Sequence, residues 1–134
     1  MGYRFNLKRK IMKANEFRIG NKLTNFLGEV FDCNAETIRS FESNYFPYGK
    51  PLPIPLTEEW LLKFGFERIE DEIHGEITWD YQRDIDSHEC WAEWNEIGQL
   101  EGVMVDCVNR LIKYVHQLQN LYFALTNEEL EINE

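Results

Sequence analysis

The clearest pattern in the chain is a stripe of apolar residues near its C-terminal end. Successive members of the stripe are 4, 3, 4 and 3 residues apart, and on a helical wheel they fall within about 80° of one another. This spacing predicts a helix from about Tyr114 to Asn127, although residues 111–113 also suit the end of a preceding strand. The stripe consists of Leu111, Val115, Leu118, Tyr122 and Leu125.

The middle of the chain shows the period of two that predicts β-strands. Ile77, Trp79 and Tyr81 alternate with polar residues, which is typical of a strand with one buried face. Further strands are predicted over residues 90–95 and 102–108, with a turn between them. The three strands together favour an antiparallel meander.

A short helix is predicted between Thr57 and Phe64. Thr57 can cap it, two glutamates follow at its positive N-terminal end, and Gly65 can take the left-handed position after it. All four prolines lie just before this helix, between Tyr45 and Leu56. Because proline restricts itself and the residue before it to extended geometry, this segment is predicted to be a stiff connector.

The N-terminal part of the chain is predicted to be β as well. Residues 17–41 contain turn signals between short β-forming stretches, including 28–33 and 37–41, which would suit a curled sheet of the SH3-like half-barrel type. The predicted fold class is α+β, with small antiparallel sheets, a short central helix and a C-terminal helix packed on the sheet. Residues 14–134 are predicted to form a single domain.

The C-terminal helix has an unusual polar face. Between Tyr114 and Asn127 there is no Asp, Glu, Lys or Arg, although 28% of the chain is charged. A solvated helix face normally contains Glu and Lys, so neutral amides indicate a covered face. Two alternatives stay open: the face is buried under the connector and the N-terminal strands, or it docks a partner. The candidate interaction face consists of His116, Gln117, Gln119, Asn120 and Phe123.

Three blocks of the sequence carry a resemblance. The two specific ones are residues 53–67 (PIPLTEEWLLKFGFE) and 114–126 (YVHQLQNLYFALT), and a weaker one opens the match at residues 13–21. Together they resemble a family of small phage and prophage proteins from gut anaerobes, and the match begins at Met12, which favours Met12 as the usual start. Where that family commonly has Gly after the last Thr, this chain has Asn127, which also tolerates the left-handed conformation. The resemblance implies a phage-encoded accessory protein and no particular activity.

Charge is distributed unevenly along the chain. The formal net charge is −10, yet residues 1–13 contain five basic residues and no acidic one, so residues 14–134 have a charge of −15. Residues 1–13 are therefore predicted to be a flexible basic extension that could bind nucleic acid, whereas the acidic remainder favours a basic partner. No signal peptide and no apolar run of about 20 residues is found. We expect a cytoplasmic protein of a phage or prophage host, without membrane contact.

Candidate chemistry is sparse. The sequence contains no nucleophile elbow, phosphate-binding glycine loop or His-Glu-x-x-His motif, so we expect no catalytic residue and no cofactor. On an extended strand, Asp84, Asp86 and His88 would project three metal ligands to one side, and an acidic surface loop is the alternative interpretation. The three cysteines are odd in number and widely spaced, which predicts reduced, partly buried thiols.

Three classes of function are compatible with these features, and the third, a small hydrolase or metal enzyme, would use Asp84, Asp86 and His88. The first is a non-enzymatic accessory protein that acts by binding another protein or a second copy of itself. The second involves nucleic acid: the basic extension tethers the protein to DNA, or the acidic body imitates DNA and occupies a host defence protein.

Overall fold

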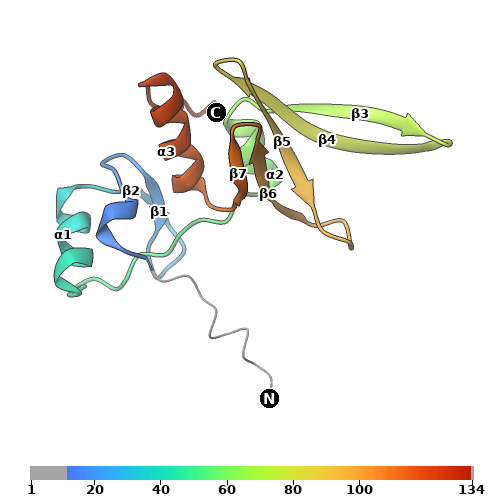
Figure 1. The fold of residues 1–134 in the computed structure, drawn as a ribbon. Coiled ribbons are helices and arrows are strands. Elements are labelled where there is room, and N and C mark those ends of the chain that lie inside the picture. The colour runs from blue at the N-terminus through green and yellow to red at the C-terminus, as the bar shows by residue number, and fades with distance from the viewer. Residues whose placement is uncertain (1–11, 134) are drawn as a thin grey trace.

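The computed structural model describes residues 12–133 and has an α+β fold (Figure 1). Within those residues a two-stranded and a five-stranded sheet, both antiparallel, are combined with three α-helices, which confirms the predicted fold class. None of these helices is both long and apolar enough to cross a membrane. The predicted basic extension, apart from Met12 and Lys13, lies outside the described residues.

The N-terminal unit, residues 12–44, has an apolar cluster of its own. Phe17, Leu23 and Cys33 are buried at its centre, and Ile38 and Phe41 pack against them. The strands β1 and β2 form an antiparallel sheet of two strands. The elements of this unit are the 3₁₀ turn η2 (Ala14–Glu16), β1 (Lys22–Thr24), β2 (Val30–Asp32) and helix α1 (Ala35–Ser43).

The structure corrects the prediction for residues 37–41, which lie in helix α1 and not in a strand. Asn34 caps this helix, because its side-chain oxygen accepts a hydrogen bond from the Thr37 N–H at 2.9 Å. Ile38 and Phe41 are three residues apart and therefore share the helix face that packs on the cluster. With only two strands present, the N-terminal unit does not form the half-barrel that the strand pattern suggested.

The proline-rich segment joins the N-terminal unit to the rest of the protein in extended geometry. Leu52 forms a single bridge with Thr24 of β1. Two residues further on, the Ile54 carbonyl accepts a hydrogen bond from the Val115 N–H at 2.8 Å. The segment contains a turn at Pro47 and Tyr48 and two isolated bridges, and it has neither a helix nor a strand, as predicted for a connector.

Helix α2 (Glu58–Lys63) begins and ends as its sequence predicts. The Thr57 hydroxyl oxygen accepts a hydrogen bond from the Trp60 N–H at 3.3 Å. Gly65 has φ +83°, and the Phe66 N–H donates to the Leu61 carbonyl at 2.9 Å, which is the hydrogen bond of a Schellman motif. Leu61 and Phe66 both enter the larger apolar cluster, so the cap also fixes the helix on the core.

The five-stranded sheet is a meander in which each strand pairs with its neighbours along the chain. The predicted meander is confirmed, but residues 102–108 do not form one strand, because a turn at Asp106 and Cys107 divides them. A further strand, β3, precedes the predicted ones. The strands are β3 (Glu67–Ile73), β4 (Glu76–Ile85), β5 (His88–Trp94), β6 (Leu100–Val105) and β7 (Val108–Ile112).

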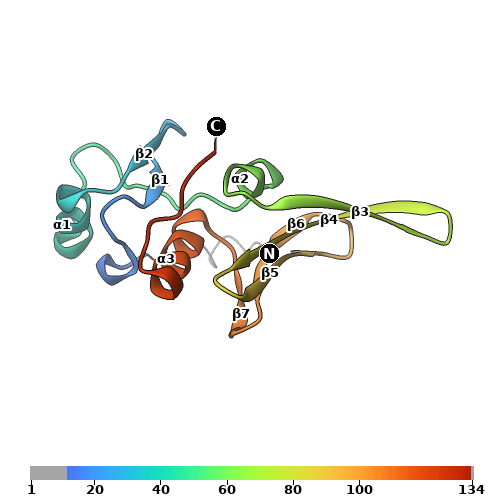
Figure 2. The same cartoon turned by 90° about the horizontal axis from the view of Figure 1, so that it is seen from above.

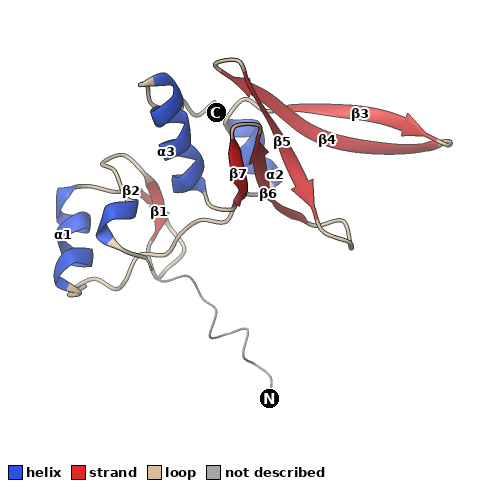
Figure 3. Cartoon of the chain, viewed as in Figure 1, coloured by secondary structure: helices blue, strands red, loops and turns tan. Residues whose placement is uncertain are grey.

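Helix α3 (Val115–Thr126) is the predicted C-terminal helix, and it lies between the N-terminal unit and the five-stranded sheet (Figures 1 and 3). Asn127 ends it with φ 60° and ψ 24°, the left-handed conformation expected of this residue. Its apolar stripe joins the larger cluster, which forms the body of the protein. Residues at the centre of that cluster are Leu61, Phe64, Ile85, Val103, Val105, Val115 and Leu118.

Candidate functional site

The neutral face of α3 lies against the N-terminal unit. Gln119 is only 3% exposed. Its Oε1 accepts a hydrogen bond from the Lys22 backbone N–H at 2.8 Å, and its Nε2 donates to the Gly20 carbonyl at 3.4 Å. A single neutral amide therefore satisfies a backbone donor and a backbone acceptor at the start of β1.

Asn120 continues this contact one residue further along the helix. Its Oδ1 accepts hydrogen bonds from Asn21 Nδ2 at 2.8 Å and from Arg18 Nη1 at 3.0 Å. Its Nδ2 donates to the Glu16 carbonyl at 2.8 Å. The absence of charge between Tyr114 and Asn127 thus has a structural cause: amides match the donors and acceptors of a polypeptide backbone, whereas a buried charge would be costly.

The remaining residues of the face have different surroundings. His116 is buried, with its ring centroid 5.0 Å from that of Phe17 and its Nε2 3.5 Å from Glu16 Oε1. Phe123 is covered by the Arg18 guanidinium, whose carbon lies 3.9 Å from the ring centroid. Gln117 turns back to its own helix start, where its Oε1 accepts from the backbone N–H groups of residues 113 and 114 at 3.1 and 3.2 Å.

His116, Gln119 and Asn120 join α3 to the N-terminal unit within one chain. The side chains of His116 and Gln119 are almost fully buried, as the first of the two alternatives expects. Gln117, Asn120 and Phe123 are half-buried. That a partner docks on this part of the face stays a prediction.

The predicted metal ligands Asp84, Asp86 and His88 do not come together. Asp86 and Ser87 both have positive φ, at 46° and 73°, and reverse the chain between β4 and β5. The alternation that would place three side chains on one side needs a continuous strand, and this turn interrupts it. His88 lies instead beside Asp106 and Cys107, the two residues of the turn between β6 and β7.

Asp106 is held by three contacts with β5. Its Oδ1 lies 2.9 Å from His88 Nδ1, and its Oδ2 accepts a hydrogen bond from the Glu89 N–H at 2.9 Å. Its own N–H donates to the Glu89 carbonyl at 3.0 Å. Two hydrogen bonds lower the pKa of the Asp106 carboxyl group: the one from the Glu89 N–H has the larger effect, and the one with His88 the smaller. This side chain is therefore a carboxylate at neutral pH.

The most exposed element of secondary structure is the hairpin of β3 and β4. β4 pairs with β5 only from Gln82 to Ile85, so residues 67–80, here called the arm, form a ribbon of two strands. Figure 2 shows the arm extending beyond the rest of the sheet. Every residue of the arm except Asp80 is exposed. Both edges of this ribbon therefore lack a neighbouring strand within the described residues.

The arm combines large apolar side chains with a strong negative charge. Ile69 and Ile73 share one face, while Ile77 and Trp79 lie on the other. Ile77 is 60% exposed and Trp79 is 43% exposed, with the Arg68 guanidinium carbon 3.8 Å from a ring centroid of Trp79. The arm contains one basic residue and six acidic ones, namely Glu67, Glu70, Asp71, Glu72, Glu76 and Asp80.

Sequence reasoning missed the outer strand of the arm. Residues 67–73 contain only two apolar residues, Ile69 and Ile73, so their pattern is dominated by charge. The available signal was the pair His74-Gly75, since two residues with positive φ close a tight hairpin. Together with the predicted strand that begins near Ile77, this pair indicates an antiparallel partner on its N-terminal side.

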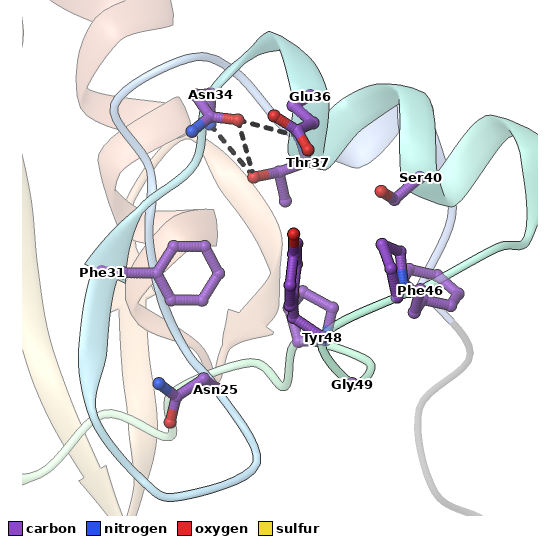
Figure 4. A pocket seen from close by; sticks show the side chains of 11 residues that line it. Asn25, Phe31, Asn34, Glu36, Thr37, Ser40, Phe46, Tyr48 and Gly49 are labelled. Atoms are coloured by element: carbon purple, nitrogen blue, oxygen red, sulfur yellow. Dashed lines mark hydrogen bonds between the residues drawn. The ribbon is translucent and has the colours of Figure 1, made fainter.

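A cavity of about 320 Å³ lies in the N-terminal region, between β2, α1 and the loop that begins after α1 (Figure 4). Phe31, Phe46 and Tyr48 contribute aromatic walls, and Asn34 and Thr37 lie at one end, where their hydrogen bonds cap α1. Tyr48 is 81% exposed, so one wall of the cavity is open to solvent. The cavity has no cluster of ionisable groups that would define a reaction.

No family model matches the chain, and no curated protein or solved structure matches it either. Function is therefore inferred from the geometry and chemistry of the described residues. Of the surfaces described above, the arm has the largest set of exposed apolar side chains on one regular element.

Proposed function

We propose that this protein is a non-enzymatic binding module that acts by protein–protein contact, and that the arm is the surface that meets the partner. The observation behind this proposal is the two-stranded ribbon itself. It presents Ile69, Ile73, Ile77 and Trp79 to solvent on two strands that no third strand flanks within the described residues. An isolated hairpin is at best marginally stable in water, so an arm of this length gains stability from a partner.

The strand edges of the arm add to this argument. An exposed edge offers unpaired N–H and C=O groups to any other chain, and natural proteins block such edges with charged residues. Here the carboxylates exclude general pairing, while the isoleucines and Trp79 leave an apolar surface to bury. Burying one such side chain stabilises a complex by about 1.5–3 kcal/mol. The arm is thus suited to a specific partner and protected against unspecific association.

The charge of the arm indicates the chemistry of that partner. Residues 67–80 have a formal charge of −5 with His74 neutral, in a chain of net charge −10. A basic surface with an apolar centre complements this arrangement, and opposite charges accelerate the encounter. A second copy of the arm is disfavoured, because its carboxylates would face like charges.

Affinity capture with matched variants tests this proposal. The bait is the full chain, and the arm variant replaces Ile69, Ile73 and Ile77 with Ser. The control replaces Ile97 with Ser, because Ile97 is 77% exposed but lies in the turn between β5 and β6. We expect a basic protein to be retained by the wild type and the control, to elute with salt, and to be lost with the arm variant. Equal retention by all three baits would contradict the proposal.

The nucleic-acid hypothesis makes a different prediction in the same experiment. Six carboxylates along one extended element favour imitation of a DNA backbone as the second candidate function. In that case the captured protein binds DNA, and duplex DNA added to the lysate displaces the bait. A bait lacking residues 1–11 separates the arm from the basic extension as the source of binding. The phage or prophage origin stays a prediction, which the neighbouring genes would test.

A further inference from the structure

We propose that His88, Asp106 and Cys107 form a binding site for a divalent metal ion of the zinc type. The three residues lie at the end of the sheet where the β4–β5 turn and the β6–β7 turn meet, outside the arm. A donor atom of each lies within 4.8 Å of the donor atoms of the other two. Nitrogen, carboxylate oxygen and sulfur thus converge on one point.

The strand register explains why these residues meet. β5 and β6 are antiparallel, and Cys90 pairs with Val105. Continuing that register by two residues on each strand places His88 opposite Cys107. Asp106 lies between them in the chain and binds the backbone of Glu89 through both its N–H and its Oδ2. The donors are therefore set by backbone pairing and not by flexible loops.

Asp106 positions the histidine for a metal ion. Its Oδ1 lies 2.9 Å from His88 Nδ1, and without an ion the two atoms share one hydrogen bond. An ion at this point would replace the hydrogen of that bond and bind His88 Nδ1, Asp106 Oδ1 and Cys107 Sγ. Asp106 Oδ2 would keep its hydrogen bond from the Glu89 N–H, which orients the carboxylate.

The donor set selects the metal. Magnesium and calcium prefer oxygen ligands, whereas a thiolate together with an imidazole favours zinc or cobalt. Zinc is usually four-coordinate, so three protein donors leave one position for water. His88 is one-third exposed and Asp106 and Cys107 are exposed, which leaves the site open to an ion from solution.

Titration of the metal-free full chain with Co²⁺ tests this site. We expect one equivalent to bind and to give the charge-transfer absorption of a cobalt–thiolate bond. Cys107→Ser should abolish that absorption, and His88→Gln should weaken binding by at least about tenfold. Cys107 is exposed, so its substitution should leave the melting temperature in a chelator unchanged.

Two controls separate this site from other metal binding. Asp86 belongs to the ligand set predicted from the sequence, Asp84, Asp86 and His88, but not to the site proposed here. Asp86→Asn should therefore leave cobalt binding unchanged. Zn²⁺ should displace Co²⁺ and raise the melting temperature of the wild type but not of Cys107→Ser. The proposal would be overturned if no charge-transfer band appeared, or if Cys107→Ser bound the metal as tightly as the wild type.

Discussion

Gln119 of helix α3 accepts a hydrogen bond from the backbone N–H of Lys22 at 2.8 Å, although 97 positions separate the two residues in the chain. This contact joins the N-terminal unit to a helix whose other face belongs to the core of the body. The polar face of α3 is therefore an internal seam between two apolar clusters. It lacks charged residues because its amide side chains form hydrogen bonds with backbone groups of the N-terminal unit.

Removal of the Gln119 side chain should destabilise the protein. In Gln119→Ala the partly buried Lys22 N–H loses its acceptor, which costs about 1–3 kcal/mol. The free energy of unfolding from denaturant titration measures this loss. Gln99→Ala is the matched control, because Gln99 is exposed and should change stability by no more than about 0.5 kcal/mol. Equal effects of the two substitutions would show that the seam contributes nothing.

Gly102 allows β6 and β7 to approach closely. A Cβ at this position would lie 2.3 Å from the Ile112 carbonyl oxygen, so Gly102→Ala must push the two strands apart. We expect a loss of at least about 3 kcal/mol, measured by thermal or chemical unfolding. Gly98→Ala is the control: Gly98 also has positive φ but nothing within 4 Å of its added Cβ, which predicts a cost of about 1–2 kcal/mol. A smaller loss for Gly102→Ala than for Gly98→Ala would contradict this packing.

The three thiols should differ sharply in reactivity. Burial raises the pKa of Cys33. The pKa of Cys90 is raised to about 12, mainly by burial and further by the negative charge of Asp106. Cys107, in contrast, is exposed in a turn. Since the thiolate is the reactive form, alkylation of the native protein near pH 8 should modify Cys107 alone. Mass spectrometry of the native and denatured protein checks this. Rapid modification of Cys90 in the folded state would contradict its burial.

Because the pKa of Cys90 is raised in the native state, the free energy of unfolding should fall at alkaline pH. An unfolded thiol ionises near pH 8.5–9, while the native Cys90 stays protonated until about pH 12. The unfolded state therefore loses its proton first, and the contribution of this group is fully present below about pH 8.5 and declines as pH rises above it. The denaturant midpoint should fall between roughly pH 9 and 11, and it should fall less in Cys90→Ala.

Much of the fold could be predicted because the relevant signals are local. The stripe from Val115 to Leu125 defines α3, whereas Leu111, its first predicted member, lies in β7. Thr57 and Gly65 define both ends of α2. Helix α1 was mistaken for a strand because Thr37, Ile38 and Phe41 favour β-structure individually. In the structure Asn34 caps this segment as a helix, and Ile38 and Phe41 share the helix face that packs on the apolar cluster.

The candidate sites were harder to predict because they depend on register. Cys107 meets His88 only because Cys90 pairs with Val105, and no local pattern specifies that pairing. Strand β3 forms because each of its seven residues has a partner on β4, although its own sequence is mostly charged. The amide face was recognised by composition, yet the same composition suits a docking surface and an internal seam. Only the contacts of Gln119 and Asn120 separate the two.

Site-specific photo-crosslinking in living cells tests whether the arm is the surface that contacts the partner. A photoreactive phenylalanine analogue replaces Ile77 in the arm or, as a control of similar exposure, Ile97 in the turn between β5 and β6. The predicted result is one discrete adduct at position 77, with a basic protein, which disappears when Glu70 and Glu72 are changed to Lys. An adduct of equal strength at position 97, or one at position 77 that survives this charge reversal, would contradict the assignment of the arm as the binding surface.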